Sequence, residues 1–370
     1  MNLATCMQDP ANRRLLAVAE DQIRGFHAAP FAEIARCCAL PEAEVRERLL
    51  RLLRAGVVRR VRQTLLSTSL AQGALVAWRL PEERLSAAFE WLRAHDPFTG
   101  HIVLRRAESP AAPGAAFRLW TTLKVPTGYG SLQEHTTLLA RRLGAQESVL
   151  LPVVGMFSLG VGHVRRAGLR PGERLAQAPR MQRPESPVLT PQEWAVLLSL
   201  KESLREEEFA LPCPWAARAA QLGMSTENYC AVAAELDKRG VIGRFATFLD
   251  HTAPADRHSG TGAAGLFLWA VEPGEEERAG GEVGRHICMT HCYWRRGGER
   301  FGGAQIMGVA HATDAEGVRA HKAAIDAHLA EAGIRVRYTA IFRSERSEIR
   351  PSEISPALYA DWLAEQGGGS

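Results

Sequence analysis

Long apolar runs are absent from this sequence of 370 residues. No stretch approaches the roughly 18 uninterrupted apolar residues of a membrane-spanning helix, so no membrane association is expected. The first ten residues also lack the basic start and apolar centre of a secretory signal. We therefore expect a soluble cytoplasmic protein, and the 46% hydrophobic content predicts a normally packed core.

The cysteines form no C-x-x-C pair, and their number is odd. They are Cys6, Cys37, Cys38, Cys213, Cys230, Cys288 and Cys292. This pattern argues against a disulfide framework and against a zinc ribbon.

Lysine is scarce among the 45 basic residues: only Lys124, Lys201, Lys238 and Lys322 occur, and the other 41 are arginine. Arginine binds carboxylates and phosphates through two parallel hydrogen bonds, whereas lysine acts as a point charge. A GC-rich genome would also favour arginine throughout a protein. Only clustered arginines therefore indicate an anion-binding site.

The chain contains an internal repeat, which must be identified before any motif is interpreted. Residues 30–61 align without a gap with residues 214–245, and Gly56 falls on Gly240. Each copy reads as helix, short turn, helix, glycine and then a β-rich run, with apolar residues at helical spacing. This order predicts a winged helix-turn-helix in each copy.

A second, looser repeat follows each of these segments. His101–Arg106 (HIVLRR) lines up with His291–Arg296 (HCYWRR), between similar apolar strands and helical segments. The predicted order in each copy is β-α-β-β-α-β, which is ferredoxin-like. The fold class is therefore predicted as α+β, with two tandem units, each a winged helix-turn-helix followed by a ferredoxin-like domain.

The same patterns give the expected domain boundaries. Residues 162–190 are rich in Pro, Gly and Arg, which predicts a linker between the copies. The winged helix-turn-helix domains are expected at 11–66 and 191–250, the ferredoxin-like domains at 67–161 and 262–345, and a C-terminal tail at 346–370.

With this architecture, the sequence resembles the leucine-responsive/asparagine regulator (Lrp/AsnC) family and, more closely, its enzymatic offshoot, the sirohaem decarboxylases. The motif that carries the resemblance is the strand His291–Arg296, the loop 297–303, a second strand at 304–310, and His311. Members of that family occur as two related subunits or as a tandem fusion, and this chain resembles the fusion. An aromatic-Asn-Leu-aromatic segment that is usual in the family is absent from both copies.

The resemblance implies that the acetate side chains at C12 and C18 of sirohaem are converted to methyl groups, in haem or haem d1 biosynthesis. It implies that His291 and His311 are essential, either delivering a proton or ligating the iron of the substrate. No separate cofactor is expected, because the tetrapyrrole is itself the electron sink. We expect the two units to pair internally, with a further homodimer or a complex with related subunits left open.

Sirohaem carries eight carboxylates, so a site for it needs cations around a flat apolar slot. Neighbouring side chains on a strand point to opposite faces, so only one arginine of each adjacent pair is expected to line a given pocket. Each candidate also has an ordinary structural explanation, as a core residue or a salt-bridged strand end. The candidate substrate-binding residues are Tyr293, Arg295, Arg296, His101, Arg105, Arg106 and Trp120.

Two alternatives to an enzyme stay open. A DNA-reading helix needs basic or amide side chains in its N-terminal half, whereas the helix expected from Glu42 places carboxylates at Glu44 and Glu47. We therefore expect no DNA binding, although the basic segment Arg59–Arg62 keeps a ligand-responsive transcription regulator as one alternative. The missing aromatic-Asn-Leu-aromatic segment supports the other, a catalytically silent tetrapyrrole-binding protein.

Overall fold

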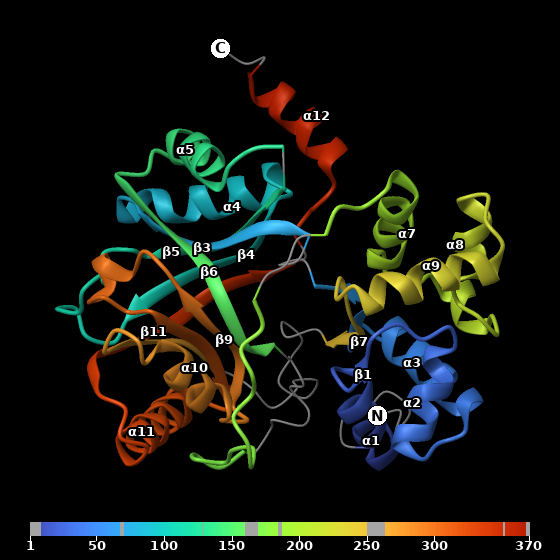
Figure 1. Ribbon diagram of the computed structural model, residues 1–370, viewed down its shortest axis with the longest axis horizontal. Coiled ribbons are helices and arrows are strands. Elements are labelled where there is room, and N and C mark those ends of the chain that lie inside the picture. Colours follow the sequence, from blue (N-terminus) through green and yellow to red (C-terminus); the bar gives the residue numbers. More distant parts are fainter. Residues whose placement is uncertain are drawn as a thin grey trace. The chain divides into compact units, whose positions relative to one another are not determined.

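The computed structural model describes residues 9–66, 70–127, 129–159, 169–183, 187–249, 263–350 and 352–367. The chain divides into two compact units, which are interleaved along the sequence. Unit 1 comprises Met1–Leu66, Val161–Ala167 and Pro187–Thr261, and unit 2 comprises Ser67–Gly160, Gly168–Ser186 and Gly262–Ser370. Each unit therefore combines corresponding parts of both sequence copies, in a mixed α and β fold (Figure 1).

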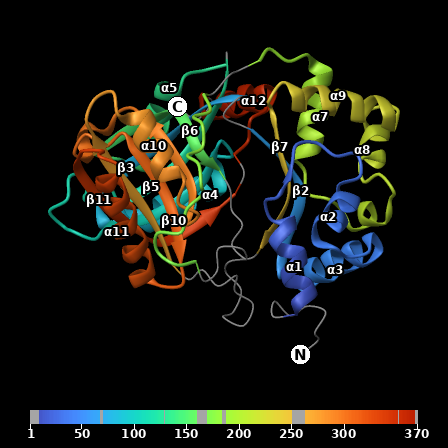
Figure 2. The same ribbon diagram turned by 60° about the horizontal axis from the view of Figure 1, so that its bottom comes forward.

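Unit 1 is mainly helical (Figure 2). Its helices are α1 (Pro10–Ala19), α2 (Pro30–Cys38), α3 (Glu42–Arg54), α7 (Pro191–Lys201), the 3-10 helix η3 (Glu206–Ala210), α8 (Ala216–Gln221) and α9 (Thr226–Lys238). Its strands are β1 (Ile23–Arg24), β2 (Val58–Leu65) and β7 (Ile242–Leu249).

The second helix of each copy follows the predicted pattern. Val45, Leu49 and Leu52 lie at intervals of three and four, and together they bury one face of α3. Gly56 and Gly240 both have φ of +70°, in the left-handed region that a glycine adopts without strain. These glycines end α3 and α9, and the chain then enters β2 and β7.

The strands that follow these helices pair with each other across the two copies. The antiparallel sheet has the order β1-β7-β2, with Gln63 opposite Phe245. Arg62, in the segment expected to form a basic wing, is largely buried here: its guanidinium lies 5.2 Å from the ring centroid of Phe248 and donates to the Lys201 carbonyl at 3.0 Å. Burial lowers the pKa of Arg62 to about 10, so it remains charged near neutral pH.

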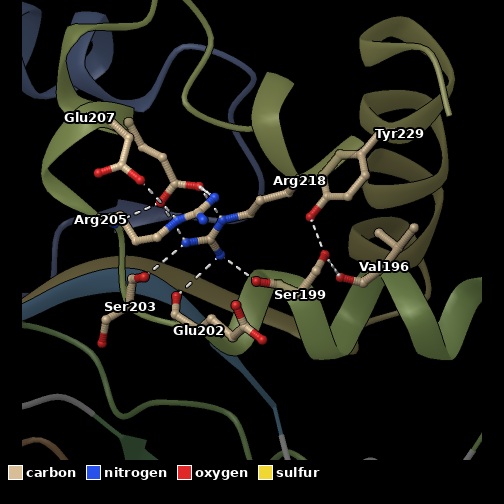
Figure 3. Close-up of polar contacts among 9 residues, drawn as sticks. Val196, Ser199, Glu202, Ser203, Arg205, Glu207, Arg218 and Tyr229 are labelled. Atoms are coloured by element: carbon tan, nitrogen blue, oxygen red, sulfur yellow. Dashed lines mark hydrogen bonds and ion pairs between the residues drawn. The ribbon is translucent and has the colours of Figure 1, made fainter. Parts of the chain in front are cut away.

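A buried arginine holds several segments of unit 1 together (Figure 3). Arg218, in α8, forms two hydrogen bonds to the Glu208 carboxylate, from Nε at 2.9 Å and from Nη2 at 3.0 Å. It also donates to the carbonyls of Ser199, Glu202 and Ser203 at the end of α7. Both partners of the ion pair are almost fully buried, at 2% and 0% side-chain exposure. The C-terminal carbonyls of α7 thus receive donors that the helix itself does not provide.

Unit 2 contains a sheet and the helices around it. Its strands are β3 (Ala71–Arg79), β4 (Thr99–Ala107), β5 (Leu119–Pro126), β6 (Glu147–Leu159), β8 (Ala263–Val271), β9 (Met289–Arg295), β10 (Ile306–Ala312) and β11 (Val336–Ile349). Its helices are η2 (Glu82–Arg84), α4 (Leu85–His95), α5 (Leu132–Leu143), α10 (Glu276–Gly284), η5 (Gly298–Phe301), α11 (Ala315–Glu331) and α12 (Pro356–Gly367).

The eight strands of unit 2 close into one antiparallel barrel, in the order β10-β8-β11-β4-β5-β3-β6-β9. Each copy contributes four consecutive strands, β4-β5-β3-β6 from the first and β9-β10-β8-β11 from the second. The barrel closes because β4 pairs with β11 and β6 pairs with β9. The element order in each copy is β-α-β-β-α-β, as predicted, but the two sheets are joined into one.

The helices cover the outside of the barrel. Helices α4, α5 and α12 pack with β3, β4 and β5 around Trp78, Phe89 and Phe98. Helices α10 and α11 pack with β8, β9 and β10 around Trp269 and Ile325 (Figure 1). Side chains on the opposite face of the strands therefore point into the barrel, since residues alternate between the two faces of a strand.

Aromatic side chains fill one part of the interior. Trp120, Phe301 and Phe342 are fully buried, and the ring centroids of Trp120 and Phe301 are 5.0 Å apart. Phe301 comes from the segment 297–303, which was expected to be a flexible loop. Instead this segment contains η5, and Phe301 anchors it in the core.

The structure corrects two of the predicted segments. Residues 169–183 of the expected linker belong to unit 2, where Gln182 pairs with Met156 of β6 and Arg174 pairs with His286. The expected tail begins too early, because β11 continues to Ile349 in order to pair with β4. Sequence composition missed both because backbone pairing does not depend on side-chain type.

None of the helices in the described ranges is long and apolar enough to cross a membrane.

The buried ion pair of unit 1 gives a stability prediction. Replacement Arg218→Met should lower the free energy of unfolding by about 3 to 5 kcal/mol, because it leaves the Glu208 carboxylate buried without its partner. The double variant with Glu208→Leu should recover part of this loss. Arg36→Met, which breaks the exposed pair with Glu33, is the matched control and should leave the denaturation midpoint unchanged. An unaltered midpoint for Arg218→Met would contradict this role.

Candidate functional site

Two histidines, one from each sequence copy, meet inside the barrel. His101 lies on β4 and His291 on β9, two strands that are opposite each other in the barrel order. Their rings are nearly perpendicular, with centroids 6.4 Å apart. His291 Nδ1 also lies 3.1 Å from the Thr290 hydroxyl. The backbone N–H of His101 donates to the hydroxyl of Thr122 at 2.8 Å, which attaches this part of β4 to β5.

Alternate residues of β9 extend this cluster. The rings of His291 and Tyr293 are stacked, with centroids 6.2 Å apart. The guanidinium of Arg295 lies 4.5 Å from the centroid of the Tyr293 ring, and its Nη1 donates to the Leu151 carbonyl at 2.9 Å. The order imidazole, phenol, guanidinium along one strand face follows directly from the two-residue period of a strand.

The two arginine pairs divide between faces as predicted. Arg105 is 6% exposed, and its Nη1 donates to the Ser344 hydroxyl at 2.9 Å. Arg106 is half-exposed and forms an ion pair with Glu345 at 2.6 Å, so its expected role in binding substrate is not supported by its position. Arg295 is likewise buried, whereas Arg296 is exposed beyond the end of β9, where its backbone N–H donates to the Pro152 carbonyl at 3.2 Å. One arginine of each pair, Arg105 and Arg295, therefore faces the interior.

The remaining candidates, His311 and Trp120, lie in different parts of the barrel interior. His311 is near the end of β10, next to β9, and is opposite Ala264 of β8. By strand alternation it shares the inward face with Met307 and Val309. Trp120 is fully buried, and its indole N–H donates to the Phe117 carbonyl at 2.8 Å. Trp120 is therefore part of the aromatic core.

The histidine part of the interior is accessible, unlike the aromatic part. His101, Lys124, His291, Tyr293 and His311 are each only partly buried, although they lie on inward faces. Two surface cavities lie elsewhere, of about 510 Å³ beside α3 and about 690 Å³ between α5 and α12.

Lys124 is a residue of this interior that the sequence reading did not select. It lies on β5 opposite Gly73 of β3, between the outward residues Leu123 and Val125 of the helix-covered core. Burial and, secondarily, the charge of Arg295 lower the pKa of Lys124 from 10.5 to about 7. Its rarity was the available signal, because a lysine stands out in a chain that otherwise uses arginine.

The cations of this interior lack acidic partners. Among the described residues, neither Lys124 nor Arg105 nor Arg295 has a carboxylate within hydrogen-bond or ion-pair distance. The Nε atoms of Arg105 and Arg295 are buried without a hydrogen-bond partner. Burial lowers the pKa of both arginines to about 10, so they stay charged at neutral pH. Unpaired buried cations are costly, and an anionic ligand would supply the missing charge.

These features define the class of protein: an α+β chain in which two copies of one unit close a single barrel with a cationic, histidine-bearing interior. No protein-family model matches the sequence. The relatives that do match are sirohaem decarboxylases, so the resemblance drawn from the sequence is confirmed.

The sequence relatives cover most of the chain. The siroheme decarboxylase of Hydrogenobacter thermophilus is 27% identical over 278 residues, which are 74% of this chain and 75% of that protein. The siroheme decarboxylase NirDL subunit of Paracoccus pantotrophus is 26% identical over 268 residues, 72% of this chain and 74% of that subunit. The siroheme decarboxylase NirH subunit of Pseudomonas aeruginosa is 37% identical over 82 residues, 22% of this chain and 45% of that subunit.

The structural similarity extends over nearly the whole chain. The crystal structure of the siroheme decarboxylase NirDL in complex with an iron-uroporphyrin III analogue has a TM-score of 0.64 and 19% sequence identity. The alignment covers 96% of this chain and 99% of that one. A second NirDL structure gives a TM-score of 0.65. The two proteins share the fold.

A second histidine cluster lies on the outside of the barrel. Nε2 of His328, in α11, donates a hydrogen bond to the Glu282 carboxylate at 2.6 Å, and Arg174 donates to the other ring nitrogen, Nδ1, at 2.6 Å. The ring of His286 is 5.2 Å from that of His328 and is almost fully buried, with both nitrogens unpartnered in the described structure. Burial, followed by the charges of His328 and Arg174, lowers the pKa of His286 to about 4.

His286 should therefore make stability depend on pH. Its folded pKa of about 4 lies below the usual 6.5, so the unfolded chain binds the extra proton between these values. The free energy of unfolding should have its full value above pH 6.5 and should fall by about 3 kcal/mol as the pH decreases towards 4. Denaturant unfolding across this range checks the prediction. His286→Phe should flatten the dependence, and an equally steep fall in that variant would contradict it.

Proposed function

We propose that this protein is a sirohaem decarboxylase, a carboxy-lyase that converts the acetate side chains at C12 and C18 of sirohaem to methyl groups. The observation that carries the proposal is the set of inward cations Arg105, Lys124 and Arg295, which lack carboxylate partners in the described structure. A tetrapyrrole with eight acid side chains supplies the anionic charge that this interior needs. The named relatives and the NirDL structure with an iron-porphyrin analogue support the same assignment.

The residues divide between binding and chemistry. The arginines would pair with carboxylates that do not react, because an ion pair to the departing carboxylate stabilises the ground state and not the transition state. Tyr293, whose ring contacts the imidazole of His291 and the guanidinium of Arg295, offers a hydroxyl for a carboxylate of the substrate. We propose that His291 and His101, whose rings approach each other inside the barrel, either deliver a proton or ligate the iron of the substrate. His311 lies on β10, beside β9, and faces the inside of the barrel as His291 does. We propose that it assists His291 in this role.

We propose that no separate cofactor takes part. Loss of carbon dioxide leaves an electron pair on a methylene carbon attached to a pyrrole ring, and the conjugated ring system of the substrate accepts it. What the protein supplies is orientation, charge and a proton.

We infer that the helical parts are a scaffold of winged helix-turn-helix type and that the α/β parts are ferredoxin-like halves of an internal pseudo-dimer. The strand order within each half and the pairing of β4 with β11 and of β6 with β9 support this inference. The relatives include subunits named NirDL and NirH, so assembly with related subunits, or as a homodimer, is part of the proposal. The cytoplasmic location expected from the sequence stays a prediction.

The regulator alternative is less well supported. Along α3, the carboxylates of Glu42 and Glu44 form ion pairs with Arg46 and Arg48, and Arg62 of the expected wing is largely buried. These cations are therefore already engaged within the protein and not displayed to phosphates. A salt-dependent shift of promoter DNA in a gel would favour the regulator over the enzyme.

The central test is anaerobic incubation with sirohaem, followed by mass spectrometry. Wild type should release carbon dioxide, and the mass of the tetrapyrrole should fall by about 44 mass units for each acetate converted. His291→Ala should lower the turnover rate by roughly 10² to 10⁴, the usual contribution of a positioned proton donor. Arg106→Gln, which removes an outward arginine of the same barrel, is the matched control and should retain wild-type turnover. Unchanged substrate with a shifted Soret band in wild type would identify a silent tetrapyrrole-binding protein instead.

A second test asks whether the two copies provide one site or two. Because the rings of His101 and His291 approach within 6.4 Å, we expect each single alanine variant to abolish most of the turnover. The double variant should be hardly worse than either one, since residues that act as a unit have non-additive effects. Independent sites would instead leave each single variant with about half of the activity, and the losses would add.

A further inference from the structure

The strands of unit 2 place one primary amine among the inward-facing groups. Lys124 lies on the same face of β5 as Trp120 and Thr122, since Leu123 and Val125 belong to the core on the other face. Across from it, β3 contributes Gly73. A methyl group on Gly73 would lie 3.3 Å from Lys124 Nζ. The ammonium therefore lies directly over a position that carries no side chain.

The surroundings of this amine are cationic. The charged group that acts on Lys124 is Arg295 of β9, and the other titratable groups on the inward faces of this part of the barrel are His101 of β4 and His291 and Tyr293 of β9. None of them is a carboxylate, and no described carboxylate forms a hydrogen bond or ion pair with Lys124. Lys124 is half-buried and has no described acidic partner, so no structural contact explains why lysine occupies this position.

We propose that Lys124 is the acid that delivers the proton to the substrate carbon after carbon dioxide has left. The inference rests on the proposed function, and it names a residue that neither the sequence motif nor the histidine cluster identifies. It also leaves the two imidazoles available for binding the macrocycle or its iron.

The proton balance of the step is simple. The bond between the methylene carbon and the carboxyl carbon breaks, carbon dioxide leaves, and the electron pair remains on the methylene carbon and the attached ring. A new C–H bond forms with a proton from Lys124 Nζ, which gives the methyl group and a neutral amine. Water then reprotonates the amine. No oxidant or reductant is consumed.

The environment of Lys124 suits this sequence of events. Approach of the acetate carboxylate favours the charged ammonium, because an opposite charge raises the pKa of an amine. When carbon dioxide leaves, the negative charge passes to the methylene carbon and the attached ring, which then take the proton from the ammonium. In the ligand-free protein, burial and the charge of Arg295 lower the pKa of Lys124 to about 7. Donors whose pKa lies near the working pH are the most effective ones.

Two substitutions separate charge from proton delivery. Lys124→Arg keeps a cation at this position, but a guanidinium does not give up its proton near neutral pH. Lys124→Met removes both charge and proton. We expect Lys124→Arg to bind sirohaem with wild-type affinity in an anaerobic Soret titration and to lose turnover by at least about 100-fold, in kcat rather than KM. Lys124→Met should lose turnover equally and bind roughly tenfold more weakly.

Stability and pH provide the controls. Lys124→Met should unfold at the same or a higher denaturant concentration than wild type, because it removes a half-buried cation that has no described acidic partner. Loss of turnover in a protein of undiminished stability excludes misfolding as its cause. The pH profile of kcat/KM in wild type should show a descending limb near pH 7, where the ammonium of the free protein loses its proton, and residual turnover in Lys124→Arg should lack this limb.

The outcomes distinguish this proposal from the one on which it rests. An active wild type together with a Lys124→Arg variant within threefold of its turnover overturns the role of Lys124 alone, and shows that only positive charge is needed there. A wild type that binds sirohaem without releasing carbon dioxide overturns both. Loss of turnover in Lys124→Arg with intact binding supports the proposal.

Discussion

The pairing of strands between the two sequence copies is the interaction on which the whole molecule depends. In unit 2, β4 pairs with β11 and β6 pairs with β9. These two strand pairings join the two four-stranded sheets into one closed barrel. Closure leaves no free sheet edge in the barrel, and it gives the strands a common inside. Side chains that are almost 200 residues apart in the sequence, such as His101 and His291, meet only because of it.

The closed sheet also explains the charge pattern of the interior. An outward arginine such as Arg106 finds carboxylates on the surface, whereas the inward Arg105 and Arg295 find only a hydroxyl and a carbonyl. The molecule keeps these cations buried at a cost in stability. Proteins retain such groups where function needs them, and the proposed tetrapyrrole substrate would supply the missing negative charge.

Sequence reasoning predicted local features well and relations between the copies poorly. Helical spacing and the glycines at 56 and 240 gave the helices of unit 1, and strand alternation predicted that Arg105 and Arg106 would face opposite ways. The barrel was missed because nothing in a strand's own residues specifies a partner from the other copy. Lys124 was missed for a related reason: its inward direction and its cationic neighbours exist only after closure. The same holds for Phe301, which looked like part of a loop and is a core residue.

The interleaving of the copies has a consequence for how the chain is made. Gln63 of β2 pairs with Phe245 of β7, which is synthesised 182 residues later. At about 5 to 20 residues per second, β2 waits on the order of ten to forty seconds for its neighbour. During that interval the backbone N–H and C=O groups of β2 have no native sheet partner, so they are open to pairing with other strands.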